Sequence, residues 1–164
     1  MESSFGFGKR VDLDFDAAID KVTADLQTEG FGVLSDIDVA AKMKEKLDKD
    51  MPRYRILGAC NPALANQAIE AVPDIGLLLP CNVLVREEED GAVNVSFMDP
   101  ISVMSLVDHP GVEPLAGEVR ARLERVLDVP VSPGSGCDGK KPLYAGTVAA
   151  AGFSRVVLSL AAEV

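Results

Sequence analysis

Residues 54–62 read YRILGACNP, and residues 76–83 read GLLLPCNV. Each segment is an apolar run of the kind that forms a buried strand, and each contains a Cys-Asn step. Asn61-Pro62 is a helix start, because Asn caps the free amides of a first turn and Pro already has a helical φ. A spacer of helix length separates the segments. They predict a strand–helix–strand unit that can bring two thiols to the same end of a sheet.

Cap and stop signals predict two more helices before this unit. Asp14 and Asp38 are each followed by apolar residues at helical spacing, so we expect a helix after each of them. Gly30 is expected to end the first helix, because glycine takes the left-handed conformation at low cost. The apolar stripe of the second helix consists of Val39, Met43 and Leu47.

The remaining apolar runs predict the strands. We expect strands over residues 5–11, 31–37, 54–60, 75–85 and 92–98. Pro80 is expected at an edge or a bulge of its strand, because proline cannot donate to the ladder. The stretch after Asp99-Pro100 is read as irregular, and the last helix is expected over 113–127. Helix crossovers do not continue to the end, so the order favours an α+β fold with an antiparallel sheet packed against helices.

Length and charge bound the class of protein. The chain has 164 residues, which fits one domain, and a formal net charge of −10. This charge argues against binding nucleic acid or anionic membranes, because phosphates need clustered Lys and Arg. We see no secretory signal and no apolar run near the roughly 20 residues that span a bilayer. Three cysteines without a disulfide-like spacing favour a reducing cytoplasm.

The composition changes near residue 130. We therefore expect a domain over residues 1–129, a Gly/Pro-rich linker over 130–142 and an extension over 143–164. Residues 134–141 imitate a phosphate-binding loop but have Lys141 where such a loop needs Ser or Thr. We reject nucleotide binding there and read Cys137 as an exposed linker thiol.

Several blocks, in order, carry a family resemblance. They are GFGVL at 30–34, Ile37-Asp38, YRILGACNP at 54–62, GLLLPCNV at 76–83 and Asp99-Pro100. Over about residues 5–129 the chain resembles the bacterial and archaeal family catalogued as domain of unknown function 302. The resemblance implies a small α+β domain, often a homodimer, in a fold compared with the TATA-binding-protein class. It implies no established activity.

The two cysteines of the paired segments are the candidate catalytic residues. Cys60 is expected just before a helix amino terminus, where amides and the helix dipole can lower the pKa of a thiol. Cys81 could then be its partner in a redox couple, a persulfide relay or a soft-metal site. The alternative is that both thiols only pack in the core, since free cysteine is among the most buried residue types.

Four polar residues are candidates for binding a small-molecule ligand near these thiols: Asn61, Asn82, Asp99 and His109. Asn61 is also a helix cap, Asn82 could instead tie a bulge, and Asp99 could simply begin a turn. His109 is the only histidine, so it alone has an ordinary pKa near neutrality. Met98 and Met104 are expected to pack in the core rather than to bind a soft metal.

Together these features favour a small cytoplasmic homodimeric domain that binds a small ligand or performs thiol or sulfur chemistry at Cys60 and Cys81. Soft-metal binding through the same thiols and a purely structural dimer are the alternatives. We assign no metal ligands, because a zinc site needs four and the chain supplies two paired thiols and a distant histidine. The sequence identifies no cofactor and leaves open whether the protein is an enzyme.

Overall fold

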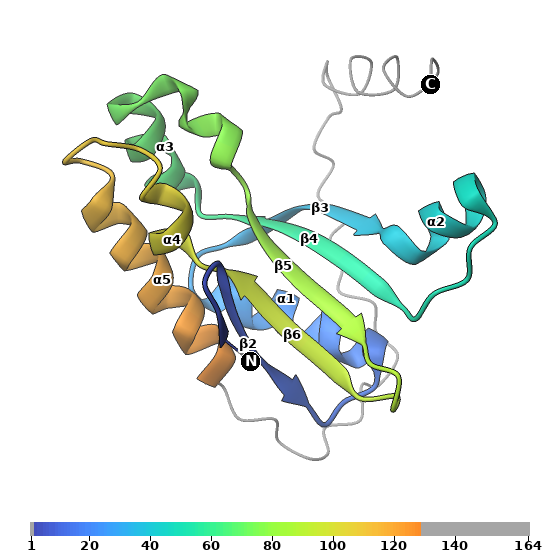
Figure 1. Ribbon diagram of the computed structural model, residues 1–164. Helices are drawn as coiled ribbons and strands as arrows, with labels where there is room; N and C mark the ends of the chain where they lie inside the picture. The colour runs from blue at the N-terminus through green and yellow to red at the C-terminus, as the bar shows by residue number, and fades with distance from the viewer. Residues whose placement is uncertain (1, 129–164) are drawn as a thin grey trace, which may run out of the picture. The chain divides into compact units, whose positions relative to one another are not determined.

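The computed structural model describes residues 2–128, which form an α+β domain built on one six-stranded antiparallel sheet (Figure 1). The strands lie in the order β1-β2-β6-β5-β4-β3. They are β1 (Glu2–Ser3), β2 (Gly6–Val11), β3 (Gly32–Asp38), β4 (Tyr54–Cys60), β5 (Cys81–Glu87) and β6 (Val93–Met98). The helices are α1 (Phe15–Thr28), α2 (Val39–Leu47), α3 (Pro62–Ala71), the 3-10 helix η1 (Pro73–Leu78), α4 (Pro100–Met104) and α5 (Glu113–Asp128). The expected α+β class is confirmed.

The predicted helix starts are formed by the expected side chains. Asp14, Asp38 and Asn61 each accept a hydrogen bond from the backbone N–H three residues later, at the start of α1, α2 and α3. Gly30 has a φ of +82°, as a residue that stops a helix in the left-handed conformation should.

One face of the sheet carries the main core. Phe7, Phe97, Val83 and Leu57 lie side by side on neighbouring strands, and all four are buried. Residues from α1 and α5, including Leu26 and Leu123, belong to the same buried cluster. We call this side the covered face.

The other side of the sheet, which we call the open face, carries the alternate residues. Ile37, Ile56, Leu84 and Ser96 form one row across four strands, in register. None of them belongs to a buried cluster of the described residues 2–128. Figure 1 looks onto this face, with α1 behind the sheet.

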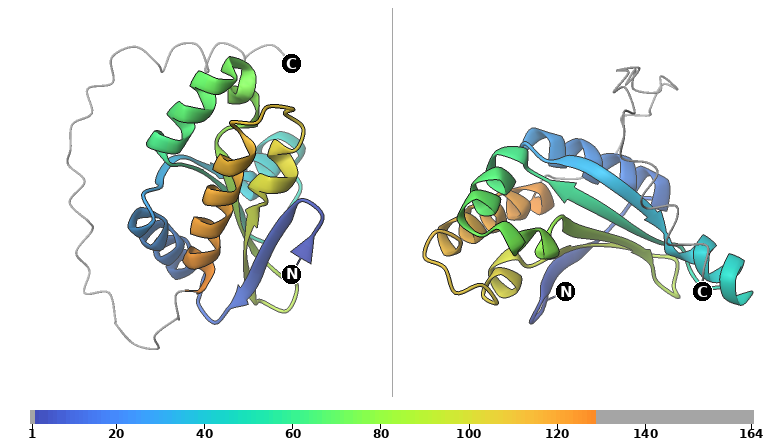
Figure 2. Two further views of the ribbon diagram at one scale, coloured as in Figure 1. Left: turned by 90° about the vertical axis from the view of Figure 1, so that its left-hand side faces the viewer. Right: turned by 90° about the horizontal axis from the view of Figure 1, so that it is seen from above.

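Helix α2 lies at the opposite end of the sheet from α3 and α5, as Figure 1 and the right-hand view of Figure 2 show. It forms over the predicted residues, but none of its residues is buried. Leu47, the last residue of the predicted apolar stripe, is 67% exposed. Val39 and Met43 are half-buried, so residues 2–128 cover the stripe only in part.

Residues 75–85 do not form the single strand that the sequence suggested. Residues Pro73–Leu78 form η1, the Leu79-Pro80 peptide is cis, and β5 begins only at Cys81. The apolar run misled because a short helical turn and a buried strand cannot be told apart by an apolar composition. Ile75 of η1 is 1% exposed and packs in a second, smaller cluster with Met104 and Val112.

The stretch after Asp99 also differs from the expectation of irregular chain. Asp99 accepts a hydrogen bond from the backbone N–H of Ile101, and residues Pro100–Met104 form the short helix α4. Among residues 2–128, no helix has the length and apolar character needed to cross a membrane. The expected linker at 130–142, the extension at 143–164, the rejected phosphate-loop imitation and Cys137 lie outside the described residues.

Candidate functional site

The last residue of β4 and the first residue of β5 lie at the same end of the sheet, beside a small cavity. Ala59 of β4 is the register partner of Cys81, the first residue of β5, and Cys60 is the last residue of β4. The cavity lies between this end of the sheet and the helices α3, α4 and α5. Its lining includes Cys60 and Cys81 together with Phe31, Leu64, Met104, Val119 and other apolar residues. The strand–helix–strand unit thus brings both predicted thiols to one place.

The size of the cavity limits what can occupy it. About 30 Å³ is open to the centre of a water-sized sphere. One water needs roughly 10–15 Å³ on this measure, so the space fits about two waters. Pockets for drug-sized organic ligands are roughly 300–1,000 Å³. As it stands, the cavity suits an occupant of one or two heavy atoms.

The two thiols differ in exposure, but burial shifts the pKa of both in the same direction. Cys60 is half-buried, Cys81 is buried, and both are free. Burial raises the pKa of the Cys60 thiol above its ordinary value. Burial, and to a lesser degree the neighbouring Cys60, raise the pKa of Cys81 to about 11. Both residues are therefore protonated at neutral pH.

This direction is opposite to the lowered pKa that the helix start suggested for Cys60. The reason lies in the first turn of α3. Pro62 has no N–H, and the N–H of Leu64 donates to Asn61 Oδ1 at 3.2 Å. These features leave fewer amide donors for a neighbouring thiolate, and burial dominates.

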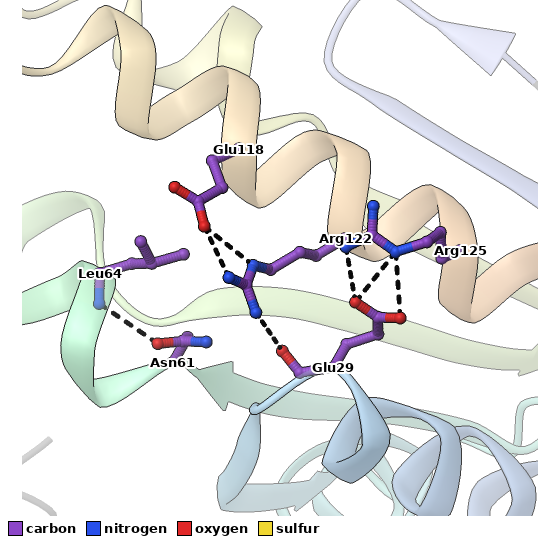
Figure 3. Close-up of polar contacts among 6 residues, drawn as sticks. All are labelled: Glu29, Asn61, Leu64, Glu118, Arg122 and Arg125. Carbon is purple, nitrogen blue, oxygen red and sulfur yellow. Dashed lines mark hydrogen bonds and ion pairs between the residues drawn. The ribbon is translucent and has the colours of Figure 1, made fainter.

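Of the four predicted ligand-binding residues, Asn61 lines the same cavity as Cys60 and Cys81. It is the one lining residue with a nitrogen or oxygen in its side chain. Figure 3 shows its amide beside the carboxyl end of α1. There Arg122 Nη1 donates to the Glu29 carbonyl at 3.2 Å, and Arg125 forms an ion pair with the Glu29 carboxylate at 2.7 Å. These contacts join α1 to α5 at the rim of the site.

Asn82, a second predicted ligand residue, lies elsewhere. It is exposed and its register partner is Gly58, on the open face, whereas Cys81 and Val83 beside it are buried. It does not line the cavity. The two halves of the second Cys-Asn step thus belong to opposite faces, as the alternation of a strand requires.

Asp99, the third predicted ligand residue, does not line the cavity, although the next residue, Pro100, does. Asp99 caps α4, and its Oδ2 forms an ion pair with Arg120 Nη1 of α5 at 2.8 Å. The Arg120 guanidinium in turn lies 3.6 Å from the centre of the Phe7 ring. Burial alone would raise the pKa of Asp99, but hydrogen bonds from Ile101, Arg120 and Ser102 outweigh it and lower that pKa.

His109, the last predicted ligand residue, lies in the connection between α4 and α5. It is half-buried, and its Nδ1 accepts a hydrogen bond from the Gly111 N–H at 3.1 Å. It does not line the cavity with the two thiols. Within residues 2–128, no group of three or more His, Cys, Asp and Glu side chains is arranged to hold a metal ion.

Sequence reasoning missed the apolar half of the site, above all Met104 of α4 and Leu64 of α3. The signal for Leu64 was its place in the first turn after Asn61-Pro62. Met104 had a weaker signal: it lies four residues after Pro100, on a helix that the sequence did not reveal.

A second hollow lies around the β5–β6 turn. It measures about 600 Å³ and is lined by residues that include Arg10, Tyr54 and Arg86. Both arginines already pair with carboxylates at 2.7 Å, Arg10 with Asp90 and Arg86 with Glu88. Their charge is thereby balanced, and none of the predicted site residues lies there.

Comparisons with known proteins agree with the fold and the resemblance. A crystal structure titled as an uncharacterized conserved protein DUF302 from Bacillus stearothermophilus is similar, with a TM-score of 0.72 and 27% identity over 77% of this chain and 98% of that chain. A protein of Aquifex aeolicus (strain VF5) named "Uncharacterized protein" is 31% identical over 48 residues. That match spans 29% of this chain and 33% of the relative. The model of the family described as "Domain of unknown function DUF302" matches residues 7–129, and the chain belongs to that family.

Proposed function

We propose that this protein is a binding module for a thiophilic ligand of one or two heavy atoms, held in the cavity by Cys60 and Cys81. The observation that carries the proposal is that Cys60 and Cys81 line one apolar cavity of about 30 Å³. The two cysteines would be the main groups that bind a thiophilic ligand there, because Asn61 is the one lining residue with a nitrogen or oxygen in its side chain. The small-molecule ligand expected from the sequence is thereby narrowed to an atom-sized one.

Binding fits these thiols better than nucleophilic catalysis does. The thiolate is the nucleophile in cysteine chemistry. Here burial raises the pKa of both thiols, so little thiolate is present at neutral pH. A ligand that displaces a proton from sulfur as it binds does not need a preformed thiolate. The site needs both thiols reduced, which supports a reducing compartment such as the cytoplasm.

Reagents of two sizes test whether the site is open to small thiophilic species. The chain would carry Cys137→Ser, so that only Cys60 and Cys81 can react. We expect methyl methanethiosulfonate to modify Cys60 in the native protein, because Cys60 is half-buried and lies at the cavity. A bulky fluorescent maleimide should react only after denaturation. Mass spectrometry of the native and denatured samples gives both extents of reaction.

If the small reagent leaves native Cys60 unmodified while denatured protein reacts fully, the cavity is closed and the binding proposal fails. Rapid reaction of the bulky reagent with native Cys81 would also overturn it, since the cavity would then not select by size. The first result favours the alternative in which the cysteines only pack.

We further propose that the protein is a homodimer that buries the open face and α2. Ile37, Ile56 and Leu84 form an apolar row on this face, and Ile37 is 47% exposed. Leu47, at the end of α2, is a further exposed apolar side chain at 67%. A second copy is the natural cover, because a twofold axis places the same apolar row against itself.

Light scattering of the full chain coupled to size-exclusion chromatography tests the dimer. We expect twice the chain mass at micromolar concentration and a shift to the monomer for Leu47→Glu or Ile37→Lys. Leu77→Glu is the matched control, because Leu77 is 89% exposed but lies on η1, outside the proposed interface. A monomeric wild type at that concentration, or an unchanged dimer in both interface variants, would refute the proposal.

A further inference from the structure

A third sulfur atom belongs to the thiol cavity. Met104, at the end of α4, lines the cavity together with Cys60 and Cys81, and it is 9% exposed. The three residues come from three different elements: the end of β4, the start of β5 and α4. The fold thus places the two cysteines and the methionine along the lining of one cavity of about 30 Å³.

The chemistry of this donor set is unusual for a protein cavity. Hard cations such as Mg²⁺ and Ca²⁺ need several oxygen ligands, and the lining offers one side-chain oxygen, that of Asn61. That oxygen already accepts the N–H of Leu64. A structural zinc site needs four Cys, His or carboxylate ligands. Soft sulfur ligands select Cu(I), zinc and iron–sulfur clusters. Iron–sulfur clusters are typically held by four cysteines and are larger than this cavity, so Cu(I) is the member of this class that three sulfur ligands suit.

From this set of donors we propose that the cavity binds one soft monovalent cation of the Cu(I) class, with Cys60, Cys81 and Met104 as its ligands. The inference rests on the proposed binding function and names its ligand. As the first metal–sulfur bond forms, one thiol releases its proton to solvent and the ion keeps its oxidation state. The occupied site then has no net charge, which suits an apolar lining.

The geometry allows the ion both to enter and to be enclosed. Cys60 is half-buried and provides the first contact from solvent, while Cys81 and Met104 lie deeper and are buried. Metal–thiolate bonds are about 2.3 Å long, so the sulfurs must close around the ion. The flexible Met104 side chain, with three rotatable bonds, can make this adjustment without moving α4.

A competition titration of the folded chain with Cu(I) tests the inference. Cys137→Ser serves as the parent, kept anaerobic, with bathocuproine disulfonate as the competing chelator. We expect one Cu(I) per chain. Cys60→Ser and Cys81→Ala should each weaken binding by at least about 10-fold, because even the loss of an outer-shell partner of a metal ligand costs that much. Met104→Leu should weaken it as well, whereas Met98→Leu, a matched change on β6 outside the cavity, should not.

Circular dichroism of each variant shows whether it has folded, and Cys60→Ser is the decisive variant because its side chain is only half-buried. No Cu(I) bound by the parent, or binding that survives Cys60→Ser and Cys81→Ala together, would overturn the inference. Equal affinities of the Met104→Leu variant and the parent would remove Met104 from the site and overturn the three-sulfur set.

The same samples separate this inference from the proposed function. If methyl methanethiosulfonate modifies native Cys60 but Cu(I) does not bind, the cavity is open and the soft-cation assignment alone fails. A polysulfide-treated parent would then be the next sample: one cysteine sulfur attacks a sulfane sulfur of the polysulfide, keeps it as a persulfide and releases a polysulfide shorter by one sulfur. A gain of one sulfur atom by mass would favour sulfur as the occupant. If neither the reagent nor Cu(I) reaches the thiols, both proposals fail together.

Discussion

The two faces of the sheet use the same strands for opposite purposes. On the covered face, Leu57, Val83 and Phe97 are paired in register and are each at most 1% exposed. One residue along the same strands, Ile56, Leu84 and Ser96 form the next row, and none of them is buried. Because strand side chains alternate between faces, the fold's stability resides in one set while the other is free to contact a partner.

The largest effect on the free energy of unfolding is expected when one leucine on each face is truncated to alanine. Leu57→Ala should lower the free energy of unfolding by about 2–5 kcal/mol, because it leaves a cavity in a fully packed row. Leu84→Ala, on the neighbouring strand, should cost about 1 kcal/mol or less, as surface substitutions do. Equilibrium unfolding in urea measures both.

Equal losses for the two leucine variants would break the comparison between the faces. A loss for Leu84→Ala that grows as the protein is concentrated would sharpen it, because the open face would then contribute through the dimer. Far-UV circular dichroism at low denaturant confirms that both variants are folded before their stabilities are compared.

The second largest effect is expected at Gly58, where the open face leaves no room for a Cβ beside Pro80. A Cβ at Gly58 would lie 2.4 Å from Ser35 Oγ and 2.8 Å from Pro80 Cγ. The serine can rotate away, but the proline ring is held next to Cys81. We expect Gly58→Ala to destabilise the domain by about 1–3 kcal/mol, as overpacking does.

Gly76→Ala is the control for this overpacking, since nothing lies within 4 Å of a Cβ at Gly76. Urea unfolding of both variants gives the comparison. A Gly58→Ala protein as stable as the wild type would show that Pro80 gives way easily, and that the entry to β5 is looser than the packing implies.

Local signals explain how much of this fold could be predicted. Asp14, Asp38 and Asn61 cap helices where expected, because a cap depends on a few neighbouring residues. The run at 75–85 failed for the opposite reason. Whether an apolar stretch turns or extends depends on what it packs against, and Ile75 packs against Met104 and Val112.

The site shows the same division between local and distant information. A strand–helix–strand unit of ordinary length allowed Cys60 and Cys81 to lie near each other, and both residues line one cavity. The exclusion of Asn82 depended on which face each residue takes, and that is decided by the point where β5 begins. Met104 could not be found without α4. The raised thiol pKa values depend on burial by helices distant in sequence.

The smallest expected effect concerns the polar edge that closes the covered face. Asp99 caps α4 and pairs with Arg120, and that guanidinium lies over Phe7 of the main core. The pKa of Asp99 is lowered in the folded protein, so its carboxylate form stabilises the fold. This contribution is complete above the ordinary pKa of about 4 and is lost as the pH falls through the lower folded value.

Asp99→Asn should therefore cost about 1 kcal/mol at pH 7, as a partly exposed ion pair does, and much less at pH 3. Asparagine still caps a helix, so the difference reports the charge alone. Asp99→Ala should lose the cap as well, and its deficit should persist at pH 3. Urea midpoints of the three proteins at both pH values measure this. A deficit of Asp99→Asn that is the same at pH 3 and pH 7 would mean that it does not come from the charge of Asp99, and would refute a stabilising ion pair with Arg120.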